Sequence, residues 1–259
     1  MKALITGGAG FIGFHLAKHL SSKGIKVTIA DNFQRGRQDN DFKSLLKQKN
    51  VSLLQVDITK EDQLAKLKSG YDFVYHFAAI NGTGNFYRIP DHVLKVGAVG
   101  TINLLEWFSK KNSKGKIIFS SSSETYGGLL GILGSKFKIP TPENVPLVVS
   151  DPKNLRWSYG ASKILGEVAF FSYAKARKFK RFAIIRYHNI YGPRMGYEHV
   201  IPQFIERIAK KENPFRIFGK DQTRSFCFVD DAVQATQLVM KNEKTNGEII
   251  HIGRDDSEI

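Results

Sequence analysis

The chain has 259 residues, of which 42% are hydrophobic, and its single cysteine, Cys227, excludes an internal disulfide and agrees with a reducing compartment. No apolar run approaches the roughly 20 residues of a membrane span, and no leader segment precedes the first predicted strand, so we expect a globular, cytoplasmic protein with no membrane partner. Lys and Arg number 39 against 24 Asp and Glu, but they are scattered over predicted helix faces and loops, which favours a solvated basic surface over a nucleic-acid site.

A glycine-rich stretch, Thr6-Gly7-Gly8-Ala9-Gly10-Phe11-Ile12-Gly13, follows a short apolar run and opens a segment with helical spacing. Two glycine triplets suit a dinucleotide turn: Gly8, Gly10 and Gly13 fit G-x-G-x-x-G, and Gly7, Gly10 and Gly13 recur every three residues. Such glycines permit a tight turn, let backbone amides approach a pyrophosphate and let the helix pack closely on the strand. The stretch therefore predicts a strand, a turn and a helix that bind a dinucleotide at the helix N-terminus.

A second strand is predicted from Ile25 to Ala30 and ends at Asp31, at the distance from the glycine turn expected of a ribose-binding acid. A carboxylate at this position accepts hydrogen bonds from the adenosine ribose and repels a 2′-phosphate, which favours NAD over NADP. Arg35 and Arg37 follow closely and leave NADP open, because an arginine could hold a 2′-phosphate.

The remainder of the chain alternates predicted strands with predicted helices. The strands are expected at 51–56, 73–76, 116–119 and 182–187, and the helices at 41–48, 61–67, 91–111 and 157–177. Residues 81–90 are predicted to be a loop, and residues 128–150 an irregular segment that suits an active-site lid. The alternation indicates a doubly wound parallel α/β sheet, the Rossmann fold. We expect residues 1–185 to be the cofactor domain and 186–259 mainly a small substrate cap, interleaved with late strands of the sheet.

Several predicted strand ends carry residues that suit a ligand, since open α/β sheets bind ligands at the carboxyl ends of their strands. Asp57, followed by Ile58, is a candidate contact for the adenine. The small residues within Phe77-Ala78-Ala79 allow close approach of a flat cofactor, whereas His76 before them is interpreted as a packed strand-end residue. The fifth strand leads into a serine-rich run from Ser120 to Gly127.

Tyr159 and Lys163 are four residues apart on a predicted helix and therefore share one face. An ammonium beside a phenol is expected to lower the phenol pKa, so Tyr159 is a candidate base for a sugar or alcohol hydroxyl. Ser122, at the end of the fifth strand, is a candidate hydrogen-bond partner for the same oxygen. The alternative is an exposed tyrosine that lies over the aliphatic part of the lysine.

These motifs resemble those of the extended short-chain dehydrogenase/reductases that act on nucleotide sugars, the NAD-dependent epimerase/dehydratase family. The resemblance covers essentially the whole chain. Its further motifs share the spacing of that family: Asp31-Asn32, Asp57-Ile58, His76-Phe77-Ala78-Ala79, Tyr159-x-x-x-Lys163, Arg186-Tyr187-His188-Asn189-Ile190-Tyr191-Gly192-Pro193, Thr223-Arg224-Ser225-Phe226 and Val229-Asp230-Asp231.

The resemblance implies a catalytic triad of Ser122, Tyr159 and Lys163 and a nucleoside-diphosphate sugar as substrate, with no metal. It implies that Ser123 contacts the sugar, that Asn189 and Arg224 hold the diphosphate, and that residues 215–218 frame the nucleobase. The residues that it implies for NAD binding are Gly7, Gly10, Phe11, Ile12, Gly13, Asp31, Asn32, Asp57, Ile58, Phe77, Ala78, Ala79, Tyr159 and Lys163. It also implies a homodimer that pairs the helix at 91–111 with the Tyr159 helix.

The resemblance leaves the reaction open. Related 4,6-dehydratases carry an Asp-Glu pair where this chain has Ser123-Glu124, which argues against dehydration and is similar to UDP-glucuronate decarboxylases. The run from Arg186 to Pro193 is instead similar to GDP-mannose 3,5-epimerases, whose acid and base would correspond to Glu124 and His199. We place epimerisation through a 4-keto sugar first and decarboxylation second.

Simpler interpretations remain for both residues, because Glu124 could only bind a sugar hydroxyl and His199 could only cap the following helix. A non-catalytic NAD-binding regulator is the alternative from another class of protein, and the intact Tyr159 and Lys163 argue against it. The family normally continues past the strand within 246–253 with a further helix and a second diphosphate-binding arginine, so we expect a truncated cap.

Overall fold

A computed structural model describes residues 1–217, 219 and 222–256 of the chain. Within these residues, seven parallel strands form one sheet in the order β3-β2-β1-β4-β5-β6-β9. Their bounds are β1 (Lys2–Thr6), β2 (Lys26–Asp31), β3 (Val51–Gln55), β4 (Phe73–His76), β5 (Lys116–Ser122), β6 (Phe182–Tyr187) and β9 (Ile249–Ile252). The strand order reverses between β1 and β4, and ligands bind at such a switch point in open α/β sheets.

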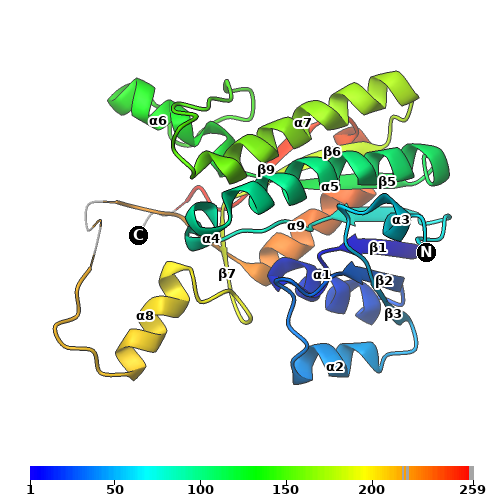
Figure 1. The fold of residues 1–259 in the computed structure, drawn as a ribbon, viewed down its shortest axis with the longest axis horizontal. Coiled ribbons are helices and arrows are strands. Elements are labelled where there is room, and N and C mark those ends of the chain that lie inside the picture. The colour runs from blue at the N-terminus through cyan, green and yellow to red at the C-terminus, as the bar shows by residue number, and fades with distance from the viewer. Residues whose placement is uncertain (218, 220–221, 257–259) are drawn as a thin grey trace.

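Helices cover both faces of the sheet, as Figure 1 shows. On one face lie α1 (Phe11–Ser22), α2 (Asn40–Leu46) and α9 (Val229–Lys241), and on the other α3 (Glu61–Leu64), α5 (Pro90–Lys111) and α7 (Trp157–Arg177). Each layer buries its own apolar cluster against the sheet. The predicted doubly wound Rossmann fold is therefore confirmed.

The turn between β1 and α1 depends on its glycines. Gly7 has a φ of +73°, and a Cβ atom at Gly13 would lie only 2.3 Å from the carbonyl oxygen of Gly7. A side chain at Gly13 would therefore push the helix off the turn. Gly7, Gly10 and Gly13 are thus the triplet that shapes this turn, while Gly8 packs on Ile29.

The second half of the chain departs from the main sheet and returns to it. Strands β7 (Asn189–Tyr191) and β8 (Phe226–Phe228) pair in parallel with each other. Helix α8 (Val200–Ala209) buries none of its residues and stands apart from the sheet in Figure 1. The chain then comes back through α9 to β9, which pairs with β6. The division into a cofactor domain and a cap remains a prediction.

Two segments that were predicted to be irregular contain helices. Residues 81–90 form α4 (Thr83–Arg88), because Asn85 and Phe86 are buried and hold the segment against its neighbours. The predicted lid contains α6 (Gly127–Leu133) and a short 3-10 turn, η2 (Gly134–Lys136), after the 3-10 turn η1 (Ser123–Tyr126). Its glycines do not break the helix, since Gly128 packs where a Cβ atom would lie 2.5 Å from the carbonyl oxygen of Val148.

Some boundaries also differ from the prediction. Strand β5 continues to Ser122, rather than ending at residue 119, because Ser120 to Ser122 pair in register with Ile185 to Tyr187 of β6. Helix α3 ends at Leu64, shorter than the predicted 61–67. A last 3-10 turn, η3 (Glu243–Thr245), leads into β9.

Candidate active site

A cleft of about 440 Å³ opens at the carboxyl ends of the strands, where the sheet order reverses. That volume is typical of small-molecule sites. The predicted site residues that line it are Gly7, Gly10, Phe11, Ile12, Gly13, Asp31, Asn32, Asp57, Ile58, Phe77, Ala78, Ala79, Ser122, Ser123, Glu124, Tyr159, Lys163, Asn189 and His199. The fold thus gathers into one cleft residues that the sequence spreads over almost two hundred positions.

One end of the cleft fits the adenosine half of NAD. Asp31 is buried, and its two carboxylate oxygens accept hydrogen bonds from the amides of Ala9 and Phe33 at 2.9 and 2.8 Å. Burial raises the pKa of Asp31, and these two amide bonds oppose the rise. The glycine turn packs closely on the segment after β4, since a Cβ atom at Gly7 would meet the backbone of Ala78 at 2.6 Å.

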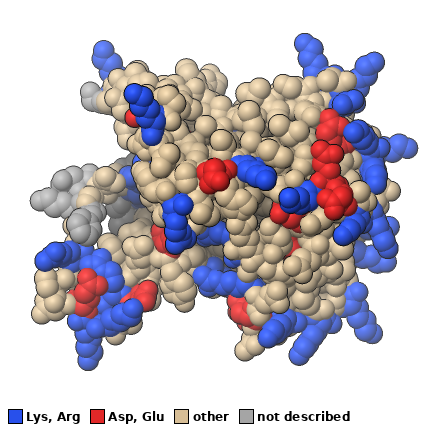
Figure 2. Space-filling model, in the orientation of Figure 1, with Lys and Arg blue, Asp and Glu red and all other residues tan. Residues whose placement is uncertain are grey.

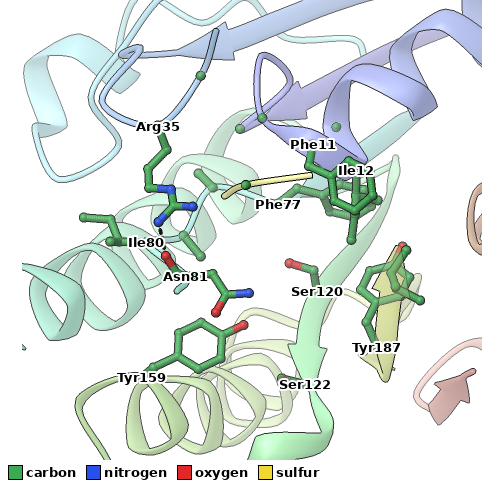
Figure 3. Close-up of a pocket in the computed structure, with 18 of the residues that line it drawn as sticks. Phe11, Ile12, Arg35, Phe77, Ile80, Asn81, Ser120, Ser122, Tyr159 and Tyr187 are labelled. Carbon is green, nitrogen blue, oxygen red and sulfur yellow. Dashed lines mark hydrogen bonds between the residues drawn. The ribbon is translucent and has the colours of Figure 1, made fainter. Parts of the chain in front are cut away.

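The other end of the cleft holds the predicted triad. Figure 3 shows Tyr159 on α7 facing the end of β5, where Ser122 lies. The ammonium of Lys163 donates to the carbonyl oxygen of Ser120 at 2.6 Å and lies 5.5 Å from the centre of the Tyr159 ring. Bound NAD would supply hydride transfer for the reaction. Tyr159 and Lys163 would hold its nicotinamide half.

The expected lowering of the Tyr159 pKa by Lys163 is not what the structure shows. Burial raises the pKa of Tyr159, and the charge of Glu124 raises it further, against a hydrogen bond with Ser122. Burial also lowers the pKa of Lys163 to about 7. Because the protonated lysine is itself disfavoured in this buried setting, it contributes no net lowering to its tyrosine neighbour.

Glu124 and His199 both line the cleft but differ in their surroundings. One nitrogen of Arg156, Nη2, donates to both carboxylate oxygens of Glu124 at 3.0 and 2.9 Å. His199 occupies the N-cap position of α8, yet its side chain makes no capping hydrogen bond. Burial lowers the pKa of His199, and the charge of Arg35 lowers it further, so the imidazole is neutral at pH 7.

The predicted diphosphate ligands are only partly brought together. Asn189 lines the cleft and donates to the carbonyl oxygen of Ser225 at 3.0 Å. Arg224 does not line it; its guanidinium is exposed and donates to the carbonyl oxygen of Thr223 and to Gln222. Phe218, in the segment predicted to frame a nucleobase, lies outside the described residues.

Sequence reasoning missed two groups of cleft residues. The first comes from the segment around α4: Asn81, Thr83 and Phe86, the last of which stacks on Tyr159 with ring centres 5.0 Å apart. The second follows the Gly192-Pro193 turn: Arg194, Met195 and Gly196. The nearby proline and glycine signalled a loop in both places, but no local pattern indicated that it faces the cleft.

Within the described residues, no helix has the length and apolarity to cross a membrane, and no cluster of His, Cys, Asp and Glu could hold a metal ion.

Comparison with known proteins agrees with this site. The chain is 38% identical to a UDP-N-acetyl-alpha-D-glucosaminuronate decarboxylase of Bacillus cytotoxicus, over 99% of this chain and 76% of that protein. It is 33% identical to a putative UDP-glucose 4-epimerase of Methanocaldococcus jannaschii, over 94% of this chain and 75% of that protein. Among solved structures, a UDP-glucose 4-epimerase of Thermotoga maritima with UDP-glucose has a TM-score of 0.81 at 28% identity, covering all of this chain and 78% of that one.

The structure of Pal from Bacillus thuringiensis is similarly close, with a TM-score of 0.85 at 29% identity over all of this chain and 79% of that one. Residues 3–253 match the NAD dependent epimerase/dehydratase family. The glycine turn, Asp31 and Tyr159 line one cleft. The chain belongs to the NAD dependent epimerase/dehydratase family and is an enzyme that uses NAD.

Proposed function

We propose that the enzyme decarboxylates a nucleoside-diphosphate uronic acid through a 4-keto intermediate. The observation that carries this proposal is the pair between Glu124 and Arg156, in which the guanidinium engages both carboxylate oxygens. The Glu124 carboxylate is held in an ion pair with Arg156, whereas decarboxylation requires no proton to be removed from a ring carbon. For this reason we rank decarboxylation ahead of the epimerisation that the sequence alone favoured.

The relatives support this choice of substrate class. The Bacillus cytotoxicus protein is a decarboxylase of a UDP-linked uronic acid. A UDP-glucuronic acid decarboxylase of Arabidopsis thaliana is 32% identical over 95% of this chain and 68% of that protein. A UDP-linked uronic acid is accordingly the first substrate to test.

The chemistry of the proposed reaction follows from the cleft residues. Tyr159 takes the proton of the C4 hydroxyl as that carbon is oxidised to a ketone. The C5–C6 bond then breaks, its electron pair forms an enolate on the C4 oxygen, and carbon dioxide leaves. The hydroxyls of Tyr159 and Ser122 donate to that oxygen, and C5 then takes up a proton. Tyr159 takes the C4 proton as its phenolate, and its raised pKa then keeps the resulting phenol protonated for this donation.

Epimerisation is the second candidate because His199 is neutral at pH 7 and lines the same cleft. A 4-keto group acidifies the protons at C3 and C5, so a neutral imidazole there is able to accept one. Glu124 would have to leave Arg156 to serve as the second group.

Product analysis in deuterium oxide separates the two reactions. The enzyme is incubated with UDP-, GDP- and dTDP-linked sugars and uronic acids, and the products are read by mass spectrometry. Loss of carbon dioxide from a uronic acid supports the proposal. Deuterium at a ring carbon with no other mass change supports 3- or 5-epimerisation, and an unlabelled product of unchanged mass but new retention time means C4 inversion. Loss of water contradicts the argument from Ser123.

Two matched variants sharpen the result. If the reaction is decarboxylation, neither Glu124 nor His199 is needed as a base. In Glu124→Gln the new side-chain amide stays within reach of Arg156, and His199→Asn removes no group that the reaction uses. Each variant should therefore retain turnover within about tenfold. If it is epimerisation, either variant blocks deuterium exchange. Retained NAD binding in both variants shows that the cleft is intact.

A further inference from the structure

Arg35 lines the cleft and reaches from the loop after Asp31 towards Asn81. It lies in the loop after Asp31, and its Nη1 atom donates to the carbonyl oxygen of Asn81 (dashed line in Figure 3). The same nitrogen pairs with Oε2 of Glu198 at 3.1 Å. Arg35 therefore joins three segments that are far apart in the sequence: the loop after β2, the segment before α4 and the segment before α8.

Glu198 is held in place by more than Arg35. Its Oε2 atom also accepts a hydrogen bond from Nδ2 of Asn85 at 3.1 Å, and its Oε1 atom lies 3.7 Å from Arg88. Gly82 makes the approach possible, because a Cβ atom there would lie 2.0 Å from Oε2 of Glu198. The Glu198 carboxylate is thus surrounded by two arginine side chains, the side-chain amide of Asn85 and the backbone of Gly82.

The other arginines near this end of the cleft are engaged as well. Arg194 pairs with Asp39, and its guanidinium lies 4.0 Å from the centre of the Phe14 ring. Arg37 donates to the carbonyl oxygen of Met195 at 3.4 Å. Arg35 lines the cleft as these two do, and its charge partner Glu198 lies outside the lining, as Asp39 does for Arg194.

An arginine beside the ribose site has a direct consequence for cofactor choice. A guanidinium forms strong charge-assisted hydrogen bonds with a phosphate, and NADP carries such a phosphate on its ribose whereas NAD does not. Arg35 follows Asp31 by four positions, and both residues line the cleft. An unpaired Arg35 would therefore offset the repulsion of a 2′-phosphate by Asp31.

We propose that Glu198 is a specificity-determining residue for the cofactor: it holds Arg35 against Asn81 and so withdraws the cation that would otherwise favour NADP. Glu198 acts through Arg35 and is not itself a ligand of the cofactor. The proposal concerns binding alone and does not depend on which reaction follows.

Equilibrium titration calorimetry with NAD and NADP tests this role in four proteins: the wild type, Glu198→Gln, Arg35→Ala and the double variant. We expect Glu198→Gln to bind NADP about tenfold more tightly while its NAD affinity changes much less, the size expected for one added charge-assisted contact. The gain must vanish in the double variant, because it requires Arg35. The readout is the ratio of the two affinities.

Glu206→Gln is the matched control. Glu206 lies on α8, its carboxylate pairs with Lys210 at 2.6 Å, and its loss changes the net charge by the same amount. The control should leave the ratio unchanged. Equal weakening of NAD and NADP by Glu198→Gln would show that Glu198 only closes the cleft, and a gain that survives removal of Arg35 would be a general charge effect. Either result overturns the proposal.

Discussion

The hydroxyl of Tyr159 is the single group on which the proposed chemistry depends most. Tyr159 is buried and stacks on Phe86, so Tyr159→Phe keeps the ring contact and removes only the oxygen. We expect turnover to fall by at least about a thousandfold, because both the base and the enolate donor are lost. NAD affinity should change little, and the comparison of steady-state rates with calorimetric NAD binding checks both.

Tyr87→Phe is the control for this variant, since Tyr87 is exposed and its hydroxyl makes only a long contact of 3.4 Å with Asn154. It should keep full activity. A Tyr159→Phe enzyme that turns over at a rate near that of the wild type would remove Tyr159 from the mechanism.

Because His76 is buried, we expect the folded protein to lose stability as the pH falls. His76 is buried between the hydroxyls of Thr6 and Thr101, each 2.9 Å away, and burial lowers its pKa from 6.5 to about 3, with a further contribution from the charge of Lys163. The unfolded chain therefore binds one more proton than the folded chain between these two pH values. Its contribution to stability is complete above pH 6.5 and is lost as the pH falls towards 3.

The measurement is urea unfolding of the wild type and His76→Gln at pH 7.5 and pH 5. The wild type should lose about 2 kcal/mol more than the variant on this acidification, from 1.36 kcal/mol per pH unit below the unfolded pKa. Equal losses in the two proteins would mean that His76 does not carry the effect.

At the residue scale, sequence reasoning predicted what is local and missed what is not. Asp31 and the glycine triplet lie close together in the chain, and their spacing is set by the geometry of one turn. The contact of Arg35 with Glu198 joins residues 163 positions apart, and no spacing rule records it. Arg224 shows the reverse case, because the matching motif predicts a ligand while the described fold leaves the side chain outside the cleft.

At the scale of elements, α5 and α7 pack against each other and leave apolar side chains facing away from the sheet. Leu165, Val168 and Phe171 follow one another at helical spacing on α7 and are exposed, as are Leu94 and Val99 on α5. Exposed apolar surface of this kind marks interaction sites. This face is the surface through which we expect the chain to form a homodimer.

The substitution Val168→Glu tests the dimer. The side chain of Val168 is 58% exposed, so a glutamate is tolerated in the monomer but would place an unpaired charge in an apolar interface. We expect the wild type to be a dimer by light scattering at micromolar concentration, and the variant a monomer. Leu238→Glu on α9, where the leucine is 70% exposed, should leave the mass unchanged. A monomeric wild type would refute the expectation.

Long elements with a clear period were predicted well, and short ones between glycines were not. In α5 and α7, apolar residues recur at helical spacing over more than twenty residues each. The strands from β1 to β6 are short apolar runs in the sequence. Helices α4 and α6 have six and seven residues, too few for a period to stand out. Their formation depends on tertiary contacts, such as those of Phe86 and Leu129, that the sequence does not display.

At the scale of the whole molecule, the formal charge is +15. On the face shown in Figure 2, lysine and arginine side chains are spread around the molecule and several lie beside acidic ones. A nucleic-acid site would instead gather them on one surface. The charge is better suited to attracting an anionic nucleotide sugar to the cleft.

Filter binding with double-stranded DNA checks this interpretation. Weak binding at low salt that disappears at physiological salt is the expected outcome for a dispersed basic surface. Binding of DNA that persists at physiological salt would contradict it. A variant with Lys110→Glu and Lys111→Glu, at the exposed end of α5, should not change the outcome.

The strand order also bears on how the chain is made. Strand β2 pairs with β1, β3 with β2, and β4 returns to the free side of β1; β5, β6 and β9 then add outward in turn. After β1, each strand of the main sheet therefore meets a partner that has already been synthesised. The cleft is different: Arg35 must wait until Glu198 emerges before its charge is paired. During synthesis, the nucleotide turn is thus complete long before the contact that we propose sets its preference.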